Sequence, residues 1–331
     1  MFIFSCRVHF KGITELICPN EVKNVLDLFE LGHVPWAESQ LCYHALAQLG
    51  REGLILVSPE DQYVCVGYHQ DARQEVDLDY CEKNGIPVFR RQVGGGAVYL
   101  DGNQIFFQVV LHKDSDLAPR NKETFYRKFL EPVIQVYRRI GIPAEFKAIN
   151  DIVTEGKKIS GTGAGEIADC IVFVGNLILD FDYETMVKVL NVPDEKFRNK
   201  VHRSIEANLT TIRRELGSTG ADKWTHPELN RLMIEEFSKV LGPFTPISED
   251  SQLATKMGDL ANLMVTESWL YRRGRVFDGR QMKIRSGVNM IHRVHKAQGG
   301  LIRADFEIVE DRYDEVCLDA ERFCLRQEAK W

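Results

Sequence analysis

Apolar residues recur along this chain in two rhythms, one typical of strands and one typical of helices. Short apolar runs, several of them rich in β-branched residues, predict strands because such residues suit the half-buried surface of a sheet. Segments whose apolar residues lie three or four positions apart predict amphipathic helices. The predicted strands are residues 54–59, 63–70, 86–91, 96–100, 104–112, a pair within 146–161, 169–181 and a β-like region at 282–308. The predicted helices are residues 38–50, 76–85, 122–141, 183–192, 195–216, 226–242 and 311–331.

Consecutive strand pairs are mixed with separate helices, and this order favours the α+β class over repeated βαβ units. The Asp101-Gly102 pair is a turn signal, so residues 96–100 and 104–112 are expected to form a hairpin. We expect a mixed or antiparallel sheet with helices packed on one face.

The length of the chain bears on its domain organisation. A chain of 331 residues is too long for one small core and favours a large domain plus a smaller one. The composition changes after residue 243, where PFTPISEDSQ is typical of a linker. We therefore expect an N-terminal extension over residues 1–30, a main domain over 31–245 and a small α+β domain over 255–331.

Charge and cysteine usage exclude some classes of protein. The net charge of −6 and the pI near 5.9 disfavour a nucleic-acid binder. The eight cysteines include no CxxC pair, so there is no zinc pattern. From the short apolar stretch at the start we expect no signal peptide, and no run approaches the roughly 20 apolar residues of a membrane helix. We expect a cytoplasmic protein with free thiols and no membrane or nucleic-acid partner.

The first segment that could carry chemistry is RRQVGGGAVYLDGN, which begins at Arg90. Two arginines before Gly94, Gly95 and Gly96 suit a loop whose N–H groups and guanidinium surround an anion. The segment is not a Walker A loop, because no GK[ST] follows, and not a dinucleotide fingerprint, because it leads into a strand. Taken alone, it fits a plain glycine-rich hairpin at least as well.

The second segment is AINDIVTEGKKISGTGAGE, residues 148–166. A lysine fixed on a strand, such as Lys157 or Lys158, can balance the charge of a phosphoryl group and a carboxylate together. Asn150 and Asp151 could hold Mg²⁺ or position a phosphate. Taken alone, the segment fits a solvated hairpin tip better.

The two segments occur together in a specific order. WAESQLCYHAL, YVCVGYHQ, RRQVGGGAV, NDIVTEGKKISG and VGNLILDF follow one another over about residues 36–245. This combination resembles the lipoate–protein ligase A family, within the biotin and lipoate ligase superfamily. The resemblance implies an α+β catalytic domain and a small C-terminal accessory domain. It also implies an enzyme that activates lipoate with ATP and Mg²⁺ to lipoyl-AMP, and then transfers the lipoyl group to a lysine of an acceptor protein.

The resemblance also implies roles for single residues. Lys158 matches the family's essential lysine, which contacts the carboxylate and the α-phosphate. Asn150 and Asp151 match a pair near the nucleotide, and Asp151 is the candidate Mg²⁺ ligand. The other candidate ligand-binding residues are Arg90, Arg91, Gly94, Gly95, Gly96, Ala97, Val98, Tyr99, Gly161, Gly67 and Gln70. Of the two arginines, Arg91 is the first choice, and Gly67 to Gln70 would lie at the mouth of the lipoyl tunnel.

The chain departs from the family pattern at several positions. Val174 stands where relatives commonly have a histidine, and Glu206 and Asn208 stand where many bacterial members have arginines. The continuation GTGAGEIADC is similar to a subset from archaea and sulfur-oxidising bacteria. The resemblance therefore implies either an acceptor like the glycine-cleavage H protein or a lipoyl domain.

Two other functions stay open. An octanoyl or lipoyl transferase would act through a cysteine without ATP; Cys170 is the nearest candidate, although a buried strand cysteine is its simpler interpretation. A non-catalytic lipoate- or nucleotide-binding protein would need neither Lys158 nor the full glycine loop. A biotin ligase is disfavoured because the GRGR order is missing. Trp269, Arg272 and Arg273 either meet the acceptor or form an ordinary basic surface.

Overall fold

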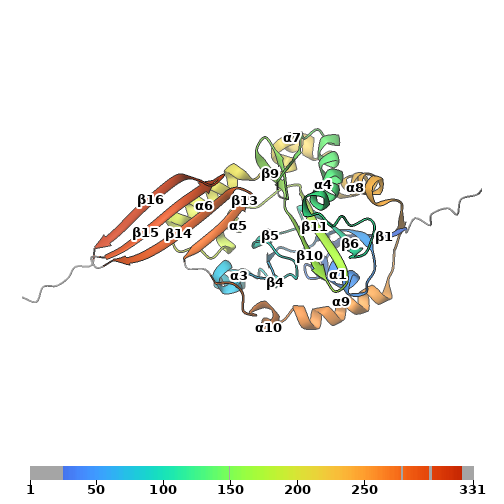
Figure 1. Cartoon of the computed structure of the whole chain (residues 1–331), viewed down its shortest axis with the longest axis horizontal. Coiled ribbons are helices and arrows are strands. Elements are labelled where there is room, and N and C mark those ends of the chain that lie inside the picture. The colour runs from blue at the N-terminus through green and yellow to red at the C-terminus, as the bar shows by residue number, and fades with distance from the viewer. Residues whose placement is uncertain (1–24, 149, 277–278, 298–299, 323–331) are drawn as a thin grey trace, which may run out of the picture.

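The computed structural model describes residues 25–148, 150–276, 279–297 and 300–322. A six-stranded mixed sheet lies at the centre of the main body, in the order β10-β11-β6-β2-β1-β12 (Figure 1). Its strands are β1 (Leu26–Val34), β2 (Gly53–Pro59), β6 (Gln104–His112), β10 (Thr162–Ile167), β11 (Cys170–Ile178) and β12 (Phe244–Pro246). Strand β1 runs parallel to β2 and β12, and the other neighbours are antiparallel.

Helices cover both faces of this sheet. On one face, alternate residues of the strands form an apolar core with α4 (Lys122–Arg139) and α8 (His226–Leu241). On the other face, the intervening strand residues form a second core with α1 (Glu38–Gln48) and α9 (Ser251–Met264). All seven residues of β2 are buried. A strand that is apolar on both sides must be covered on both sides. The predicted α+β class is therefore confirmed, but the prediction of helices on one face is wrong.

Two three-stranded sheets lie beside the central one, in the orders β4-β3-β5 and β7-β8-β9. Their strands are β3 (Tyr63–Val66), β4 (Val88–Arg90), β5 (Val98–Leu100), β7 (Glu145–Lys147), β8 (Asp151–Thr154) and β9 (Lys157–Ser160). The predicted hairpin of residues 96–100 and 104–112 is wrong, because β5 pairs with β3 while β6 pairs with β2 and β11. The turn is present, but the chain changes sheet there.

The remaining helices lie around these sheets. They are α2 (Ala72–Glu75), α3 (Leu78–Lys83), α5 (Tyr183–Val189), α6 (Glu195–Asn208), α7 (Ile212–Ala221) and α10 (Glu267–Leu270). The single helix predicted over residues 195–216 is two helices. The first helix ends because the Thr210 N–H donates to the carbonyl of Lys158 (2.9 Å), a residue of another element, and not to its own helix. Thr211 then caps the start of α7. None of the helices in the described residues is both long and apolar enough to cross a membrane.

A four-stranded antiparallel sheet extends from one end of the main body (Figure 1). Its strands are β13 (Arg280–Arg285), β14 (Val288–Ala297), β15 (Gly300–Val309) and β16 (Arg312–Arg322), in that order. The strands predicted within 282–308 are confirmed. The helix predicted at 311–331 is wrong over its described residues, because β16 pairs with the long edge of β15; residues 323–331 lie outside the described residues.

The segment between the two parts of the chain is packed against the main body. Strand β12 pairs with β1, and Leu253, Leu260 and Met264 of α9 lie in the same core as α1. Residues 243–252 are therefore not a free linker. The division of the chain into domains at about residues 245 and 255 stays a prediction.

Candidate functional site

The glycine loop, residues 91–97, connects two strands that are not paired with each other. Strands β4 and β5 lie on opposite sides of β3, so the loop crosses the end of β3 and is not a plain hairpin. A Cβ atom on Gly67, the residue after β3, would lie 2.1 Å from the Gly95 carbonyl oxygen. Only glycine permits so close an approach of two backbones. The structure thus brings together Gly67 and the glycine loop, which the sequence analysis had predicted separately.

The Arg91 side chain shapes this loop from inside. Its guanidinium donates to the carbonyl oxygens of Gly94 (2.9 Å), Gly96 (2.8 Å) and Cys65 (3.0 Å). Gly95 lies between these anchors with a φ of +103°, and a Cβ atom there would lie 2.7 Å from the Arg91 Nη2. The arginine and the glycine therefore fit each other sterically. In this arrangement Arg91 fixes the loop, and its contact with a ligand stays a prediction.

Arg90 is fully buried, and the partners of its side chain within the described residues are all backbone carbonyls. Its Nη1 donates to the carbonyls of Gly67, Tyr68 and Gln70, while its Nε and Nη2 donate to Leu270, with Arg272 as a further acceptor of Nη2. The guanidinium has five N–H donors, and these contacts occupy all three of its nitrogens. Arg90 thus connects the predicted tunnel mouth to the end of α10 and to Arg272 after it.

The remaining predicted residues of this region have supporting contacts. The Gln70 side-chain oxygen accepts from the Gly67 N–H (2.9 Å). Tyr99 is buried and its hydroxyl lies 2.6 Å from the Gln62 side-chain oxygen. Ala97 is half-buried, and Val98 is exposed. These contacts fix the turn at Gly67 to Gln70, the predicted tunnel mouth, and Tyr99 on β5.

Lys158 lies beside a buried carboxylate. Its Nζ is 2.8 Å from the Asp151 Oδ1. Asp151 begins β8, and Lys158 on β9 pairs with Val153 of β8. The Asp151 Oδ2 accepts from the Ser286 N–H (2.8 Å), which comes from the turn between β13 and β14. Burial by itself would raise the pKa of Asp151, but the Lys158 ammonium and the Ser286 N–H outweigh it and lower that pKa below its usual value. The predicted strand pair around Glu155-Gly156 is confirmed.

Strand β10 joins the two predicted segments. It begins directly after Gly161, and a Cβ atom on its Gly165 would lie 3.1 Å from Val93 of the glycine loop. The Asn150 side chain donates to the Thr162 carbonyl oxygen (3.1 Å) at the start of the strand. The Gly161 N–H donates to the Asn176 side chain on β11 (2.8 Å). The predicted residues on both segments therefore flank one strand.

Three supporting residues were missed by the sequence analysis. His44 on α1 is fully buried; its Nε2 accepts from the Gln92 N–H (3.1 Å) while its Nδ1–H donates to a carbonyl one turn earlier. Burial lowers the pKa of His44 to about 4. Asn176 and Ser286 hold Gly161 and Asp151. No local pattern marks these residues, since Ser286 is 135 positions away from Asp151.

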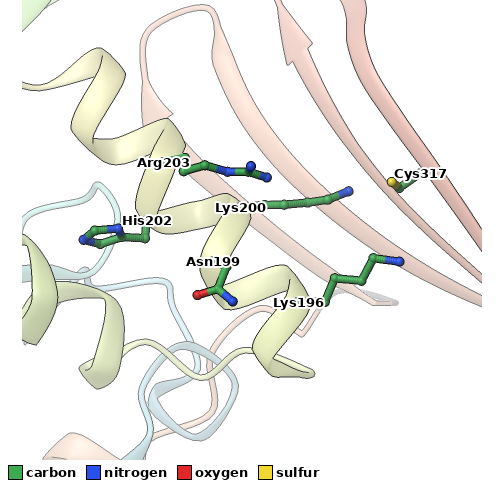
Figure 2. A pocket seen from close by; sticks show the side chains of 6 residues that line it. All are labelled: Lys196, Asn199, Lys200, His202, Arg203 and Cys317. Atoms are coloured by element: carbon green, nitrogen blue, oxygen red, sulfur yellow. The ribbon is translucent and has the colours of Figure 1, made fainter.

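A separate cavity of about 450 Å³ lies between α6 and the C-terminal sheet. Figure 2 shows its lining residues, Lys196, Asn199, Lys200, His202, Arg203 and Cys317. None of the predicted site residues lines it. Within the described ranges, no cluster of three or more His, Cys, Asp or Glu side chains could hold a metal ion. The role of Asp151 toward Mg²⁺ therefore stays a prediction.

Comparison with known proteins shows the family to which the chain belongs. Residues 33–238 match the family described as the lipoyl protein ligase A/B catalytic domain. The lipoate-protein ligase LplJ of Bacillus subtilis is 34% identical over 165 residues, which are 47% of this chain and 48% of that protein. The chain spans about half to two thirds of the length of the curated relatives it matches first.

Solved structures show the same fold. The bipartite lipoate protein ligase of Thermoplasma acidophilum, described with its E2 lipoyl domain, has a TM-score of 0.65 and 28% identity. The match covers 76% of this chain and 99% of that chain. A lipoate-protein ligase A bound with ATP has a TM-score of 0.62 at 24% identity, over 75% of this chain and 98% of that chain.

Proposed function

Since the chain belongs to the family of lipoyl protein ligase A/B catalytic domains, we propose that it is an ATP-dependent, AMP-forming lipoate–protein ligase. In the first step the lipoate carboxylate attacks the α-phosphorus of ATP, and pyrophosphate leaves. In the second step the amine of an acceptor lysine attacks the acyl carbon of lipoyl-AMP, AMP leaves, and the amine loses a proton.

The observation that carries the proposal is the position of Lys158. Its ammonium is held 2.8 Å from the Asp151 carboxylate, and its side chain is only 17% exposed. A fixed cation in a partly dehydrated site stabilises the negative charge that develops on the carboxylate and the α-phosphate during adenylation. Asp151 orients this cation before the ligands arrive, so little reorganisation is needed when they bind.

The glycine loop supplies the second part of the proposed site. The Arg91 guanidinium draws the Gly94 and Gly96 carbonyls inward, which leaves the loop's outer backbone available to the ligand. Gly94 and Gly96 have open space where a side chain would begin. A loop of this kind can lie against an acyl-adenylate and exclude water, which would otherwise hydrolyse the mixed anhydride.

Magnesium would accompany the nucleotide. Mg²⁺ at phosphate sites is usually held by one or two carboxylates together with the substrate's phosphates. Asp151 is the carboxylate next to Lys158; its oxygens contact the Lys158 Nζ and the Ser286 N–H, so one of these contacts would have to yield to the ion. Bound there, the ion would neutralise charge on the leaving pyrophosphate.

A cysteine-dependent transferase is less well supported. Burial raises the pKa of Cys42 and of Cys81 to about 12, and it also raises the pKa of Cys65 and Cys170. A thiol needs a lowered pKa to act as a nucleophile near neutral pH. Cys170 is buried where β11 pairs with His112 of β6, as expected for a structural cysteine.

The acceptor is proposed to be a lipoyl domain or a protein like the glycine-cleavage H protein. The relative from Thermoplasma is described together with its E2 lipoyl domain, which supports an acceptor of this kind. A cytoplasmic location fits the free thiols of the described cysteines.

The test uses the full chain with ATP, Mg²⁺, lipoate and a purified acceptor, either a lipoyl domain or an H-like protein. Mass spectrometry of the acceptor should show the gain of one lipoyl group. Lipoate-dependent release of pyrophosphate, measured without acceptor, isolates the first step.

Lys158→Ala is the matched variant. It should lower pyrophosphate release about 100-fold or more, as expected for loss of one charged group that stabilises a transition state. Its far-UV circular dichroism should still show a folded chain, and thermal unfolding should accompany it, because the variant leaves the buried Asp151 carboxylate without its ammonium. Equal acceptor labelling by wild type and variant, or none by wild type with either acceptor, would contradict the proposal.

A further inference from the structure

A group of aromatic and arginine side chains lies at the predicted tunnel mouth. We call it the arginine–aromatic patch; it comprises Tyr68, Trp269, Arg272, Arg273 and Arg275. The Arg272 guanidinium lies 4.4 Å from the centre of the Tyr68 ring and 5.1 Å from that of Trp269. These cation–π contacts hold Arg272 against the two rings, so this part of the patch is preformed.

The patch is attached to the candidate site by backbone contacts. The Arg275 N–H donates to the His69 carbonyl (2.7 Å). A Cβ atom on Gly274 would lie 2.2 Å from the Gln70 carbonyl oxygen, so the two segments are in direct contact. The Arg90 side chain donates to carbonyls of both segments, at Gln70 and Leu270. A molecule bound to the patch therefore lies next to the turn that supports the glycine loop.

The patch carries positive charge that the described residues do not neutralise. The Arg273 and Arg275 side chains are exposed, and neither has an ion-pair or hydrogen-bond partner within the described part of the chain. Asp71, an acid in the neighbouring turn, accepts from the N–H groups of Arg73 and Gln74 at the start of α2. The chain as a whole has a net charge of −6, so this positive surface is a local feature.

We infer that the arginine–aromatic patch is the docking surface for the acceptor protein, and that the acceptor presents acidic residues to it. Tyr, Trp and Arg are the residues most enriched at the energetic centres of protein interfaces. Exposed arginines attract an acidic partner and set its orientation. The acceptor must place a lysine amine at the acyl-adenylate, and a patch bonded to the tunnel mouth is suitably placed for that. This inference rests on the proposed ligase function.

The test is the double variant Arg273→Glu/Arg275→Glu, assayed in both half-reactions. Lipoate-dependent pyrophosphate release should be unchanged, since neither side chain touches the Lys158 or glycine-loop residues. The KM for the acceptor should rise about tenfold, with a smaller change in kcat, because like charges now oppose the acidic partner. Added salt should raise the wild-type KM and have little effect on that of the variant.

The matched control is Arg120→Glu/Lys122→Glu, which makes the same charge change at the start of α4, on the other side of the central sheet from α9. It should leave the KM for the acceptor within about twofold of wild type. An unchanged KM in the patch variant, or an equal rise in the control, would overturn the inference. So would a change of oligomeric state in the patch variant without a change in KM, since the patch would then bind a second copy of the chain. If the wild-type protein showed no lipoate-dependent release of pyrophosphate, the ligase proposal itself would be refuted.

Discussion

At the scale of single residues, the charged groups of the candidate site act first on the protein itself. Arg91 binds loop carbonyls, Arg90 joins two segments, and Lys158 is paired with Asp151. Each contact fixes a group or a backbone that would otherwise have to be ordered when the ligand binds. Such preorganisation lowers the entropic cost of binding and of the reaction.

His44 gives a residue-scale prediction on pH. Burial lowers its pKa to about 4, below the unfolded value near 6.5. Between these values the unfolded chain binds a proton that the folded chain does not, so folding stability falls as the pH is lowered through this range. The loss from pH 7 to pH 4 attributable to His44 should be about 3 kcal/mol.

Urea unfolding at several pH values measures this loss. The variant His44→Gln does not titrate, and its stability should fall less steeply between pH 6.5 and pH 4 than that of wild type. Parallel pH profiles for the two proteins would show that His44 is not held neutral. At neutral pH, the difference in stability between the variant and wild type also measures how much the hydrogen bond from the Gln92 N–H to the His44 imidazole contributes to folding.

At the scale of elements, the glycine loop depends on one of its three glycines more than on the others. Gly95→Ala must accommodate a φ of +103° and a Cβ atom 2.7 Å from Arg91, so it should cost about 1–2 kcal/mol of stability and impair adenylation. Gly94→Ala is the matched control, since its Cβ atom would meet nothing within 4 Å.

Thermal unfolding and pyrophosphate release measure the two glycine variants. Gly94→Ala should unfold within about 0.5 kcal/mol of wild type, as is usual for substitutions without a steric conflict. Equal stability of the two variants would mean that the loop can move away from Arg91 at no cost. In that case the contacts of the Arg91 guanidinium with the loop carbonyls would not determine the conformation of the loop.

At the scale of the whole molecule, the C-terminal sheet is docked by a buried ion pair. The Arg280 Nη1 on β13 lies 2.6 Å from the Glu75 Oε2 on α2, and both side chains are less than a tenth exposed. Glu75→Ala would leave the guanidinium buried without its carboxylate, which typically costs about 3 kcal/mol. We expect this variant to unfold earlier and to become sensitive to proteases near residues 270–280.

Denaturant unfolding and limited proteolysis check this expectation. Glu82→Ala removes an exposed carboxylate from the adjacent helix α3 and should change stability by less than about 0.5 kcal/mol. If Glu75→Ala behaved like this control, the ion pair would not be what holds the sheet in place. The Ser286 N–H of the same sheet donates to Asp151, which pairs with Lys158. The rate of adenylation by Glu75→Ala therefore also shows whether packing of the C-terminal sheet against the main body helps to position Lys158.

The sequence by itself determined the features that depend on neighbouring residues. Most strands and helices followed from local apolar periodicity, and the β8–β9 hairpin followed from Glu155-Gly156. The family followed from two short segments in a fixed order. These features could be predicted because hydrogen bonding and steric limits within a few residues decide them.

Only the tertiary structure decided the features that depend on distant residues. Residues 312–322 form strand β16 and not the predicted helix, because they pair along one edge of β15. Strands β5 and β6 lie in different sheets, because β5 pairs with β3 whereas β6 pairs with β2 and β11. Leu270, which accepts from Arg90, and Ser286, which donates to Asp151, each lie more than 130 positions away from their partner along the chain. Pairing at such separations is set by packing of the whole molecule, so a pattern read locally cannot contain it.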